Sequence, residues 1–205
     1  MCGGAAVPRR CSENHSETEL SGVTRCSLEP VSGATVSIRR AQADDLDFLV
    51  SLYRHEDVEP FLAAVRAREP AEILAEIERS RAEPAAFGVF VIDVDGTRAG
   101  VLRFERVNER SRIAELGGLA VHPDFRGSRV GDEAAGLFQR HLIRDLGFHR
   151  LQLEIYGFNE RAQRHAERSG FTREGVRRNA YWRNGGWVDG VLFGFVEEDL
   201  GERES

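Results

Sequence analysis

The sequence predicts one α/β domain built on a mixed, mostly antiparallel β-sheet. Two turn signals, Asp95-Gly96 and Asn184-Gly185-Gly186, each lie between strand-like runs and therefore predict two β-hairpins. In the middle of the chain, a strand, a glycine-containing loop, an amphipathic helix and another strand follow one another, which predicts a βαβ unit. The length of 205 residues and the apolar content of 41% suit one domain with a substantial core.

The first half of the domain reads as strand, helix, helix and hairpin. Residues 36–41 alternate like a strand, and residues 44–54 have an Asp start signal and helical apolar spacing. Residues 69–82 carry Pro early and apolar residues on one face, which predicts a second helix. Residues 88–94 and 99–107 form the first hairpin around Asp95-Gly96.

The second half alternates strands and helices before the final hairpin. A strand over 112–121 precedes a helix over 131–148 that ends at Gly147. The remaining predicted elements are a strand over 150–158, a short helix over 159–171 and strands near 172–182 and 187–196.

The ends of the chain differ from this folded part. Residues 1–35 are rich in Gly, Ser, Thr, Glu and Pro without periodicity, so we expect a disordered extension. The folded domain is expected over 36–200, followed by a C-terminal tail over 201–205.

Composition excludes several classes of function. The net charge is −6 and no long basic block is present, so nucleic acid is not an expected partner, whereas a cationic substrate would be tolerated or attracted. All 28 basic residues are Arg, which excludes Schiff-base and lysine-nucleophile mechanisms. No segment is apolar and long enough to span a bilayer or to act as a signal peptide, so we expect no membrane association and a cytoplasmic location.

A metal site is not expected either. Cys2, Cys11 and Cys26 all lie near the N-terminus, so the fold cannot depend on disulfides. A zinc site built from Cys11, His15 and Cys26 would lack a fourth ligand and matches no zinc spacing.

The loop between the strand over 112–121 and the next helix has features of an anion site. Backbone N–H groups at a glycine-containing loop and a helix N-terminus attract phosphate, although any βα connection also favours glycine. The loop is neither a Walker loop nor a dinucleotide fingerprint. Arg129 stands where glycine is preferred; its side chain is tolerable if it projects outward and if φ there need not be positive. The loop residues are Arg126, Gly127, Ser128, Arg129, Val130 and Gly131.

The strand before this loop contains two adjacent glycines, Gly117 and Gly118. Glycines inside a strand mark a bulge or a close approach of another group. A bulge here would push the strand away from the one over 150–158 and open a slot that points at the helix N-terminus. A long, thin ligand with a phosphate near its middle would fit.

These segments together resemble the GNAT superfamily of acyl-CoA N-acyltransferases. The loop RGSRVG, the strand AELGGLAVHP and the segment FNERAQRHAERSGFTREG carry the resemblance, which covers about 36–200. Residues 159–175 and 187–200 look most like the RimJ/RimL type, which acetylates the N-termini of ribosomal proteins. The resemblance implies a GNAT fold: an α/β (α+β) domain with six to seven strands, a central splay and about four helices.

The resemblance also implies how acetyl-CoA binds. Its pyrophosphate would lie on the backbone N–H groups of residues 126–131, with Arg129 near a phosphate or merely tolerated. Asn159 would contact the pantetheine arm at the mouth of the slot. The arm would pair like an extra strand with Leu119, Ala120 and Val121.

Acetyl transfer needs a neutral amine, so some group must accept a proton. Glu115 is the candidate because many family members carry a catalytic glutamate at this position; otherwise it is a solvated edge residue or a partner of Arg112. Glu105 is the reserve. The Val121 N–H would bind the developing oxyanion unless it is paired within the sheet.

Other polar and aromatic residues have open roles. The tyrosine that protonates the leaving thiolate in many relatives would fall at Ala166 and is absent, so water or a side chain replaces it. Asp189 either orients the acceptor or makes a structural hydrogen bond. The candidate acids are Tyr156, Tyr181 and His165, and the aromatic residues that either line the acceptor pocket or pack at the strands are Tyr181, Trp182 and Trp187.

The resulting hypothesis is an acetyl-CoA-dependent N-acetyltransferase in which a primary amine attacks directly. The acceptor would be a protein N-terminus or a small amine, and the protein a monomer or homodimer without a metal. The alternatives are another acyl-CoA, an antibiotic or polyamine acceptor, and a non-catalytic CoA-binding module.

Overall fold

A computed structural model describes residues 35–62, 68–183 and 185–202. Cys11, His15 and Cys26, the residues that the sequence analysis weighed and rejected as a zinc site, and nearly all of the expected N-terminal extension lie outside the described residues. Within the described part, no helix is long and apolar enough to cross a membrane.

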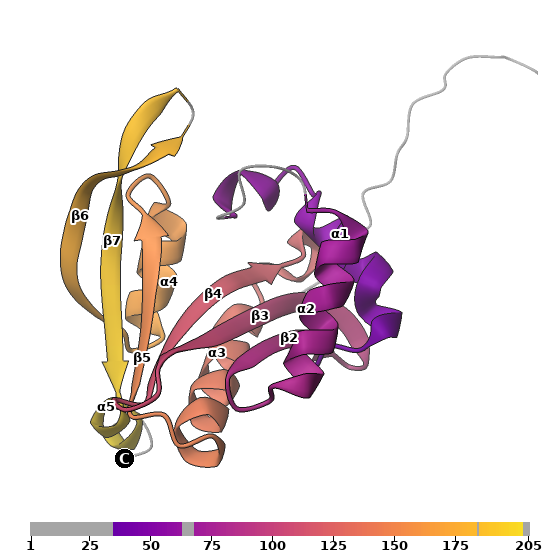
Figure 1. The fold of residues 1–205 in the computed structure, drawn as a ribbon. Helices are drawn as coiled ribbons and strands as arrows, with labels where there is room; N and C mark the ends of the chain where they lie inside the picture. The colour runs from indigo at the N-terminus through magenta and orange to yellow at the C-terminus, as the bar shows by residue number, and fades with distance from the viewer. Residues whose placement is uncertain (1–34, 63–67, 184, 203–205) are drawn as a thin grey trace, which may run out of the picture.

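The chain forms a seven-stranded mixed sheet, as the sequence predicts, and its strand order is β1-β2-β3-β4-β5-β7-β6 (Figure 1). Every neighbouring pair is antiparallel except β4 and β5, which are parallel and joined through α3. The strands are β1 (Val36–Arg40), β2 (Phe87–Val94), β3 (Thr97–Asn108), β4 (Ile113–Val121), β5 (Arg150–Tyr156), β6 (Thr172–Arg183) and β7 (Gly186–Val196). The α-helices are α1 (Leu46–Tyr53), α2 (Pro70–Ala82), α3 (Val130–Arg140), α4 (Glu160–Arg168) and α5 (Glu197–Glu202).

Helices cover both faces of the first half of the sheet, so β2 is buried along its whole length (Figure 1). Because side chains alternate along a strand, β2 contributes Val89 and Val91 to the core beneath α1 and α2, and Phe90 and Ile92 to the core beneath α3. Two hydrophobic cores therefore hold the sheet in place on either side.

The turn between β2 and β3 adopts the conformation that its sequence predicts. Asp95 and Gly96 have φ values of 49° and 80°. Positive φ at both central residues defines a type I′ turn, whose twist matches that of antiparallel strands. The hairpin prediction is confirmed.

The glycine pair in β4 forms the predicted bulge. Val101 pairs with Ala120 and Arg103 with Gly117, so two residues of β4 lie opposite Leu102 alone. Gly118 has a φ of +64°, the left-handed conformation expected for the glycine of a G1-type bulge.

The two central strands separate soon after they meet. The parallel pairing of β4 with β5 covers Ile113 to Glu115 and ends at the Glu115–Gln152 pair. Both strands then continue, β4 to Val121 and β5 to Tyr156, while they diverge (Figure 1). We call this diverging region, residues 116–121 and 153–156, the splay; it confirms the central splay expected from the sequence.

Two helical segments differ from the prediction. The predicted helix over 131–148 consists of α3 and a π-helical turn over His141–Asp145, and it ends at Gly147 with φ of +72°. The short helix α5 was not predicted and runs into the expected C-terminal tail. A local contact explains it, because the Val196 N–H donates to Asp199 Oδ2 at 2.8 Å and turns the chain at the end of β7.

A buried carboxylate joins the N-terminal elements. Asp45 is 1% exposed and accepts hydrogen bonds from Arg39, Arg98 and the Gln42 N–H. Burial raises the pKa of this carboxyl, but the hydrogen bonds and charges of its partners outweigh burial, so its pKa lies well below the usual range.

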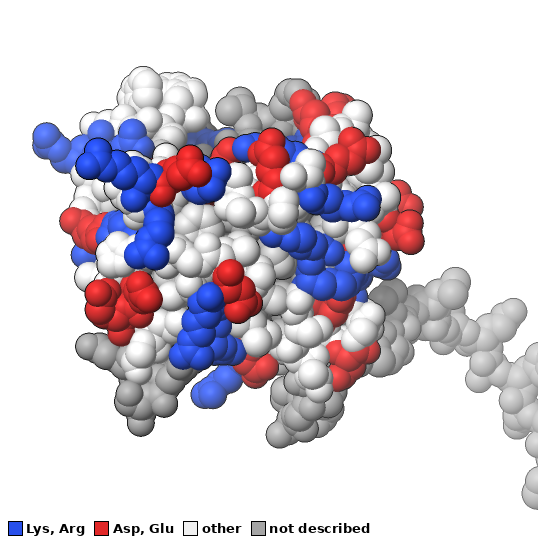
Figure 2. Space-filling view, turned by 60° about the horizontal axis from the view of Figure 1, so that its bottom comes forward, with Lys and Arg blue, Asp and Glu red and all other residues white. Residues whose placement is uncertain are grey.

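The visible surface carries both signs of charge. On the face shown in Figure 2, basic and acidic side chains are interspersed, and no continuous basic surface appears on it.

Candidate active site

The loop before α3 presents a row of backbone donors. The Arg126 N–H donates to Pro123 O at 3.1 Å, and the first N–H to bond back into α3 is that of Glu133, to Arg129 O at 3.0 Å. Between them, the N–H groups of residues 127–132 have no partner anywhere in the described part of the chain. The sequence suggested that this donor row starts at Arg126. In the structure it starts at Gly127.

Arg129 has the backbone conformation that the sequence analysis did not expect. Its φ is +61°, and Gly127 has φ of +86°, so both residues are left-handed. The sequence analysis made tolerance of this side chain conditional on a φ that need not be positive, and the structure does not meet that condition. The Arg129 side chain is exposed and contacts no partner among the residues described.

The Arg126 side chain points back along the chain instead of toward the donor row. Its Nε donates to Val121 O at 3.1 Å and its Nη2 to Asp57 O at 3.2 Å. Burial and the charge of Arg161 lower the pKa of Arg126, which the Asp57 carboxylate partly opposes. Arg126 therefore links the loop to the segment after α1.

The end of β4 offers backbone groups to the splay at Val121. The His122 N–H donates to Ala99 O at 2.8 Å, and the next pair along the ladder is Val121 with Gly100. Hydrogen-bonded and non-hydrogen-bonded pairs alternate in antiparallel sheets, so the N–H and C=O groups of Val121 point away from β3. The same alternation directs those of Ala120 toward β3, so a ligand lying along β4 would pair with Val121 and not with Ala120.

The neighbouring Leu119 belongs to the bulge. The residue is 38% exposed although it lies in a central strand. An apolar ligand segment along β4 would therefore meet an accessible hydrophobic side chain at this position.

Glu115 lies at the base of the splay, in the last β4–β5 pair. It is exposed, and its Oε2 accepts a hydrogen bond of 3.4 Å from Gln152 Nε2. It does not pair with Arg112, whose Nη1 donates to Gly147 O. Glu105 lies opposite Glu115 in β3, but its carboxylate accepts from Arg79 Nη2 at 2.9 Å. Of the two candidate bases, Glu115 is the one whose carboxylate is not held by an ion pair in the described structure.

Glu154 of β5 is a second carboxylate at the splay, and the sequence analysis missed it. It lies two residues after Gln152, so both side chains project from the same face of β5. Its Oε2 accepts from Arg177 Nη1 at 2.8 Å, whereas its Oε1 is buried without a partner among the described residues. Alternation in β5 could have indicated this face, but only the register with β4 shows that Glu115 shares it.

Aromatic rings form a row along the same side of the splay. The rings of Phe61 and Phe158 are 6.2 Å apart, those of Phe158 and Tyr156 are stacked at 5.4 Å, and those of Tyr156 and Tyr181 are 5.2 Å apart. Arg183 links Tyr156 of this row to the residue after Phe61: its Nη2 donates to the Tyr156 hydroxyl at 2.7 Å and to Leu62 O at 3.0 Å.

Two of the expected replacements for the missing tyrosine, Tyr181 and His165, are poor proton donors at neutral pH. Ala166 is 3% exposed and belongs to the core. Burial, together with the neighbouring Glu154 carboxylate, raises the pKa of Tyr181 to about 12. Burial lowers the pKa of His165 despite its contact with Asp132 at 2.8 Å, so its imidazole is mostly neutral at pH 7.

Asn159 is the N-cap of α4, where its Oδ1 accepts from the Ala162 N–H at 3.1 Å. Asp189 makes the structural hydrogen bond that was one of its two expected roles, accepting from the Asn179 N–H at 2.8 Å. Because Asn159 caps α4, it lies just after the end of β5, close to the splay.

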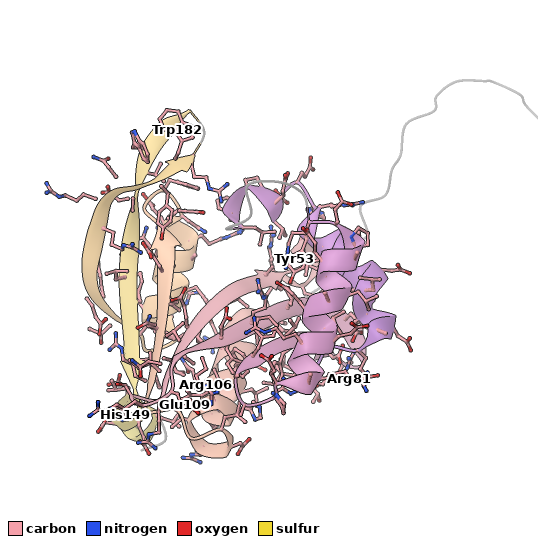
Figure 3. All side chains as sticks on the ribbon, viewed as in Figure 1. Tyr53, Arg81, Arg106, Glu109, His149 and Trp182 are labelled. Carbon is pink, nitrogen blue, oxygen red and sulfur yellow. The ribbon has the colours of Figure 1, made fainter. Side chains whose placement is uncertain are left out.

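The two tryptophans do not line the splay. Trp182 and Trp187 are 61% and 62% exposed and lie edge to face near the tip of the β6–β7 hairpin, where Figure 3 labels Trp182. Tyr181 and Arg183 contact Tyr156, so Trp182 between them points to the opposite face. Trp182 and Trp187 therefore pack against each other at the edge of the sheet, which is one of the two roles expected from the sequence.

Comparison with known proteins agrees with this geometry. The model of the Acetyltransferase (GNAT) domain matches residues 35–172. Among curated proteins, an uncharacterized N-acetyltransferase of Bacillus subtilis, YokL, is 22% identical over 82% of this chain and 93% of its own length. The spermidine N(1)-acetyltransferase of Escherichia coli is 24% identical over 78% of this chain and 85% of its own length.

Solved structures share the fold. RimL, a ribosomal L7/L12 alpha-N-protein acetyltransferase in complex with coenzyme A, superposes with a TM-score of 0.72 at 19% identity, covering 83% of this chain and 98% of its own. Spermidine N-acetyltransferase from Vibrio cholerae, in complex with CoA and spermine, gives 0.73 at 18% identity, covering 80% and 97%. The presence of RimL among these neighbours is consistent with the RimJ/RimL-type resemblance.

The chain belongs to the GNAT acetyltransferase family. It is an N-acetyltransferase that acts on an amine and uses acetyl-CoA as the acyl donor. No group of three or more His, Cys, Asp or Glu side chains in the described part could hold a metal ion.

Proposed function

We propose that this enzyme acetylates a primary amine, of a protein N-terminus or a small molecule, by direct attack on acetyl-CoA bound in the splay. The observation that carries the proposal is the junction of two features: β4 and β5 separate after Glu115, and the donor row over 127–132 lies at the end of β4. Phosphate groups bind to free N–H groups at a helix N-terminus, and a strand with outward-facing amides pairs with an extended chain.

The proposed binding mode assigns a part of acetyl-CoA to each feature. The pyrophosphate would lie on the N–H groups of residues 127–132, and the pantetheine arm would extend along β4 beside Leu119 and Val121. Asn159 uses only its Oδ1 as the helix cap, so its Nδ2 would donate to the arm. To pair with Val121 O, the arm would share that carbonyl with Arg126 or displace it.

Glu115 would accept the proton of the incoming ammonium group. The neutral amine then attacks the acetyl carbonyl carbon. As the tetrahedral intermediate collapses, its nitrogen loses a proton to solvent water, the C–S bond breaks, and the thiolate leaves. The Val121 N–H, which points away from β3, would stabilise the oxyanion that develops on the carbonyl oxygen. Water protonates the thiolate, because Tyr181 holds its proton and His165 is mostly neutral.

Glu154 would hold the acceptor ammonium before the proton is removed. Its buried Oε1 has no partner among the described residues, and a buried carboxylate oxygen without a hydrogen bond is costly unless a ligand supplies one. The acceptor amine would supply that hydrogen bond. Cytoplasmic location and a monomeric or homodimeric state stay predictions from the sequence.

The test is release of free thiol from acetyl-CoA in the presence of amine acceptors. A panel of N-terminal peptides, spermidine and an aminoglycoside covers the alternatives, and succinyl-CoA tests the donor. We expect amine-dependent thiol release with acetyl-CoA and an acetylated product by mass spectrometry. Binding of CoA without thiol release from any acceptor would refute the enzymatic proposal and favour a CoA-binding module.

A further inference from the structure

One backbone edge of β5 faces the splay. On its other edge β5 pairs with β7 in one continuous register, and directly after the strand the Gly157 N–H donates to Asp189 O at 2.8 Å. Hydrogen-bonded and non-hydrogen-bonded pairs alternate along an antiparallel ladder, so the odd-numbered residues of β5 bond to β7. The backbone groups of the even-numbered residues, which include Glu154 and Tyr156, therefore point away from β7 and toward β4.

Beyond Gln152, no described strand pairs with this edge. The parallel ladder between β4 and β5 ends at the pair of Glu115 with Gln152. A parallel ladder bonds a residue to both neighbours of the residue opposite, so a further pair of Leu116 with Leu153 would need a bond from the Glu154 N–H to Leu116 O. That pair is not formed, and neither backbone group of Glu154 has another partner in the described part of the chain.

We call residues 154–156 the free edge of β5, and it offers three backbone groups. Tyr156 O already accepts from the Asn159 N–H at 2.8 Å and from Gln163 Nε2 at 3.4 Å. The Tyr156 N–H, in contrast, has no partner among the described residues. The groups left for a ligand are the N–H and C=O of Glu154 and the N–H of Tyr156.

The order of these groups indicates the chemistry of the ligand. Donor, acceptor and donor follow one another along the free edge, and a neighbouring peptide strand matches this order with a carbonyl, an N–H and a second carbonyl. A protonated polyamine carries donors and no acceptor, so it cannot satisfy the N–H groups of Glu154 and Tyr156. Because unpaired backbone groups within a sheet are costly, a ligand that pairs with all three groups is favoured.

The position of the candidate base sets the direction of such a peptide. Glu115 lies at the base of the splay, and β5 runs from this base toward the mouth (Figure 1). A peptide whose α-amine lies near Glu115 and whose chain leaves through the mouth runs parallel to β5. In parallel pairing, its first carbonyl accepts from the Glu154 N–H, its third N–H donates to Glu154 O, and its third carbonyl accepts from the Tyr156 N–H.

We infer that the acceptor is the N-terminus of a polypeptide, held as an added parallel strand on the free edge of β5. The inference rests on the proposed acetylation of an amine at the splay, and it narrows the acceptor to a peptide α-amine. Main-chain hydrogen bonds supply the affinity in strand addition, so the enzyme recognises the backbone of its acceptor. The pantetheine arm keeps the opposite edge, along β4, because the donor row for the pyrophosphate lies at the end of β4.

The experiment changes the acceptor, because side-chain substitutions in β5 leave its backbone groups in place. Three alanine pentapeptides with an amidated C-terminus are compared with spermidine in the thiol-release assay. One pentapeptide has only amide bonds, and the other two carry an ester oxygen in place of the N–H at the third or at the fifth position. The ester changes one donor and keeps the length of the chain.

The two esters have different expected effects. The ester at the third position should lower kcat/KM about tenfold, mainly by raising KM, because it removes the donor to Glu154 O and places an oxygen opposite it. The ester at the fifth position is the matched control. Its missing N–H would face Tyr156 O, which already has two donors, so kcat/KM should stay within about twofold of the all-amide peptide. Spermidine should be a poorer acceptor than the all-amide peptide.

Hydrogen exchange followed by NMR locates the acceptor on the protein. CoA alone should slow the exchange of the N–H groups of residues 127–132. CoA together with the all-amide pentapeptide should in addition slow the exchange of the Glu154 and Tyr156 N–H groups. The Ile155 N–H, which faces β7, is the control and should exchange slowly in every sample.

The outcomes separate the inference from the proposed function. Equal use of the three pentapeptides, an equal loss with both esters, or spermidine as the best acceptor would overturn the inference and leave the amine acetyltransferase intact. Slower exchange of the Glu154 and Tyr156 N–H groups with CoA alone would also overturn it, since the pantetheine arm would then occupy β5. If no acceptor releases thiol, the proposed function fails and the inference fails with it.

Discussion

Replacing Arg129 by glycine tests how the loop before α3 stores strain and binds phosphate. Arg129 has φ of +61°, in the left-handed region that L-residues other than glycine occupy at a cost. Its side chain is exposed and makes no hydrogen bond, ion pair or ring contact with another described residue, so its replacement removes no such interaction. The substitution therefore acts through the backbone and through one charge.

The two backbone effects oppose each other. The left-handed conformation costs a non-glycine residue about 1–2 kcal/mol. Glycine, however, loses about 0.5–1 kcal/mol more conformational entropy on folding. We expect a net stabilisation of about 0.5–1 kcal/mol, which raises the Tm of a domain of this size by roughly 1–4 °C.

The charge affects CoA binding. If Arg129 contacts a phosphate at the surface, its removal should cost about 1 kcal/mol, or roughly fivefold in Kd, at low salt, and less at high salt. Arg129→Ala separates the two effects, because it removes the charge and keeps the strain: its Tm should stay close to that of the wild type, while its Kd changes as in Arg129→Gly. Thermal unfolding and calorimetric titration with CoA at two salt concentrations measure both quantities.

A second arginine provides the control for strain. Arg112 has φ of +51° at the start of β4, away from the loop, and Arg112→Gly loses a hydrogen bond of 3.3 Å to Gly147 O. It should stabilise less than Arg129→Gly and leave CoA binding unchanged. If Arg129→Gly lowered the Tm, the strain argument would be refuted. An unchanged Kd in both Arg129 variants would show that the arginine is only tolerated.

Three further predictions concern the base, the bulge and the buried carboxylate. Glu115→Gln should lower kcat by about 10²–10⁴-fold and shift the pH profile of activity to higher pH, with little change in acetyl-CoA binding. Glu105→Gln should keep an activity near that of the wild type. The reverse pattern would assign the base role to Glu105. Gly118→Ala forces a left-handed alanine whose Cβ would lie 3.2 Å from Arg103 Cδ, so it should destabilise the domain by about 1–2 kcal/mol and weaken CoA binding. Gly117→Ala, with open space around its Cβ, should do neither. Equal effects of the two substitutions would argue against the bulge as the cause. Asp45→Asn should destabilise by about 2–4 kcal/mol at pH 7. Because the pKa of Asp45 is lowered in the folded state, its contribution is fully present above the unfolded pKa of about 4 and disappears as the pH falls toward the folded value. Urea unfolding at pH 7 and pH 3 should show the gap between wild type and variant shrink, and a constant gap would contradict this linkage.

Much of the site could be predicted because short-range rules govern it. Asp95-Gly96 specifies a type I′ turn whatever surrounds it, and the Gly117-Gly118 pair indicates the bulge because few other residues adopt φ of +64°. The donor row follows from a loop entering a helix N-terminus. These features depend on the conformations of a few consecutive residues.

Other features depend on contacts between distant segments. Glu154 looks like any polar residue of an alternating strand until the parallel register places it on the same face as Glu115. Arg183 meets Tyr156 and Leu62 across sequence separations of 27 and 121 residues. No local pattern contains these pairs.

The sequence by itself determined the order of elements, the hairpins, the bulge and the family resemblance, because hydrophobic periodicity and glycine conformation are local properties. The tertiary structure decided which backbone donors of the loop are free, which of two facing glutamates is held by an ion pair, and which arginine contacts Tyr156 and Leu62 beside the splay. Each of these depends on how segments far apart in the chain pack against one another, since a charge or a donor is available to a ligand only where the rest of the fold leaves it unpaired.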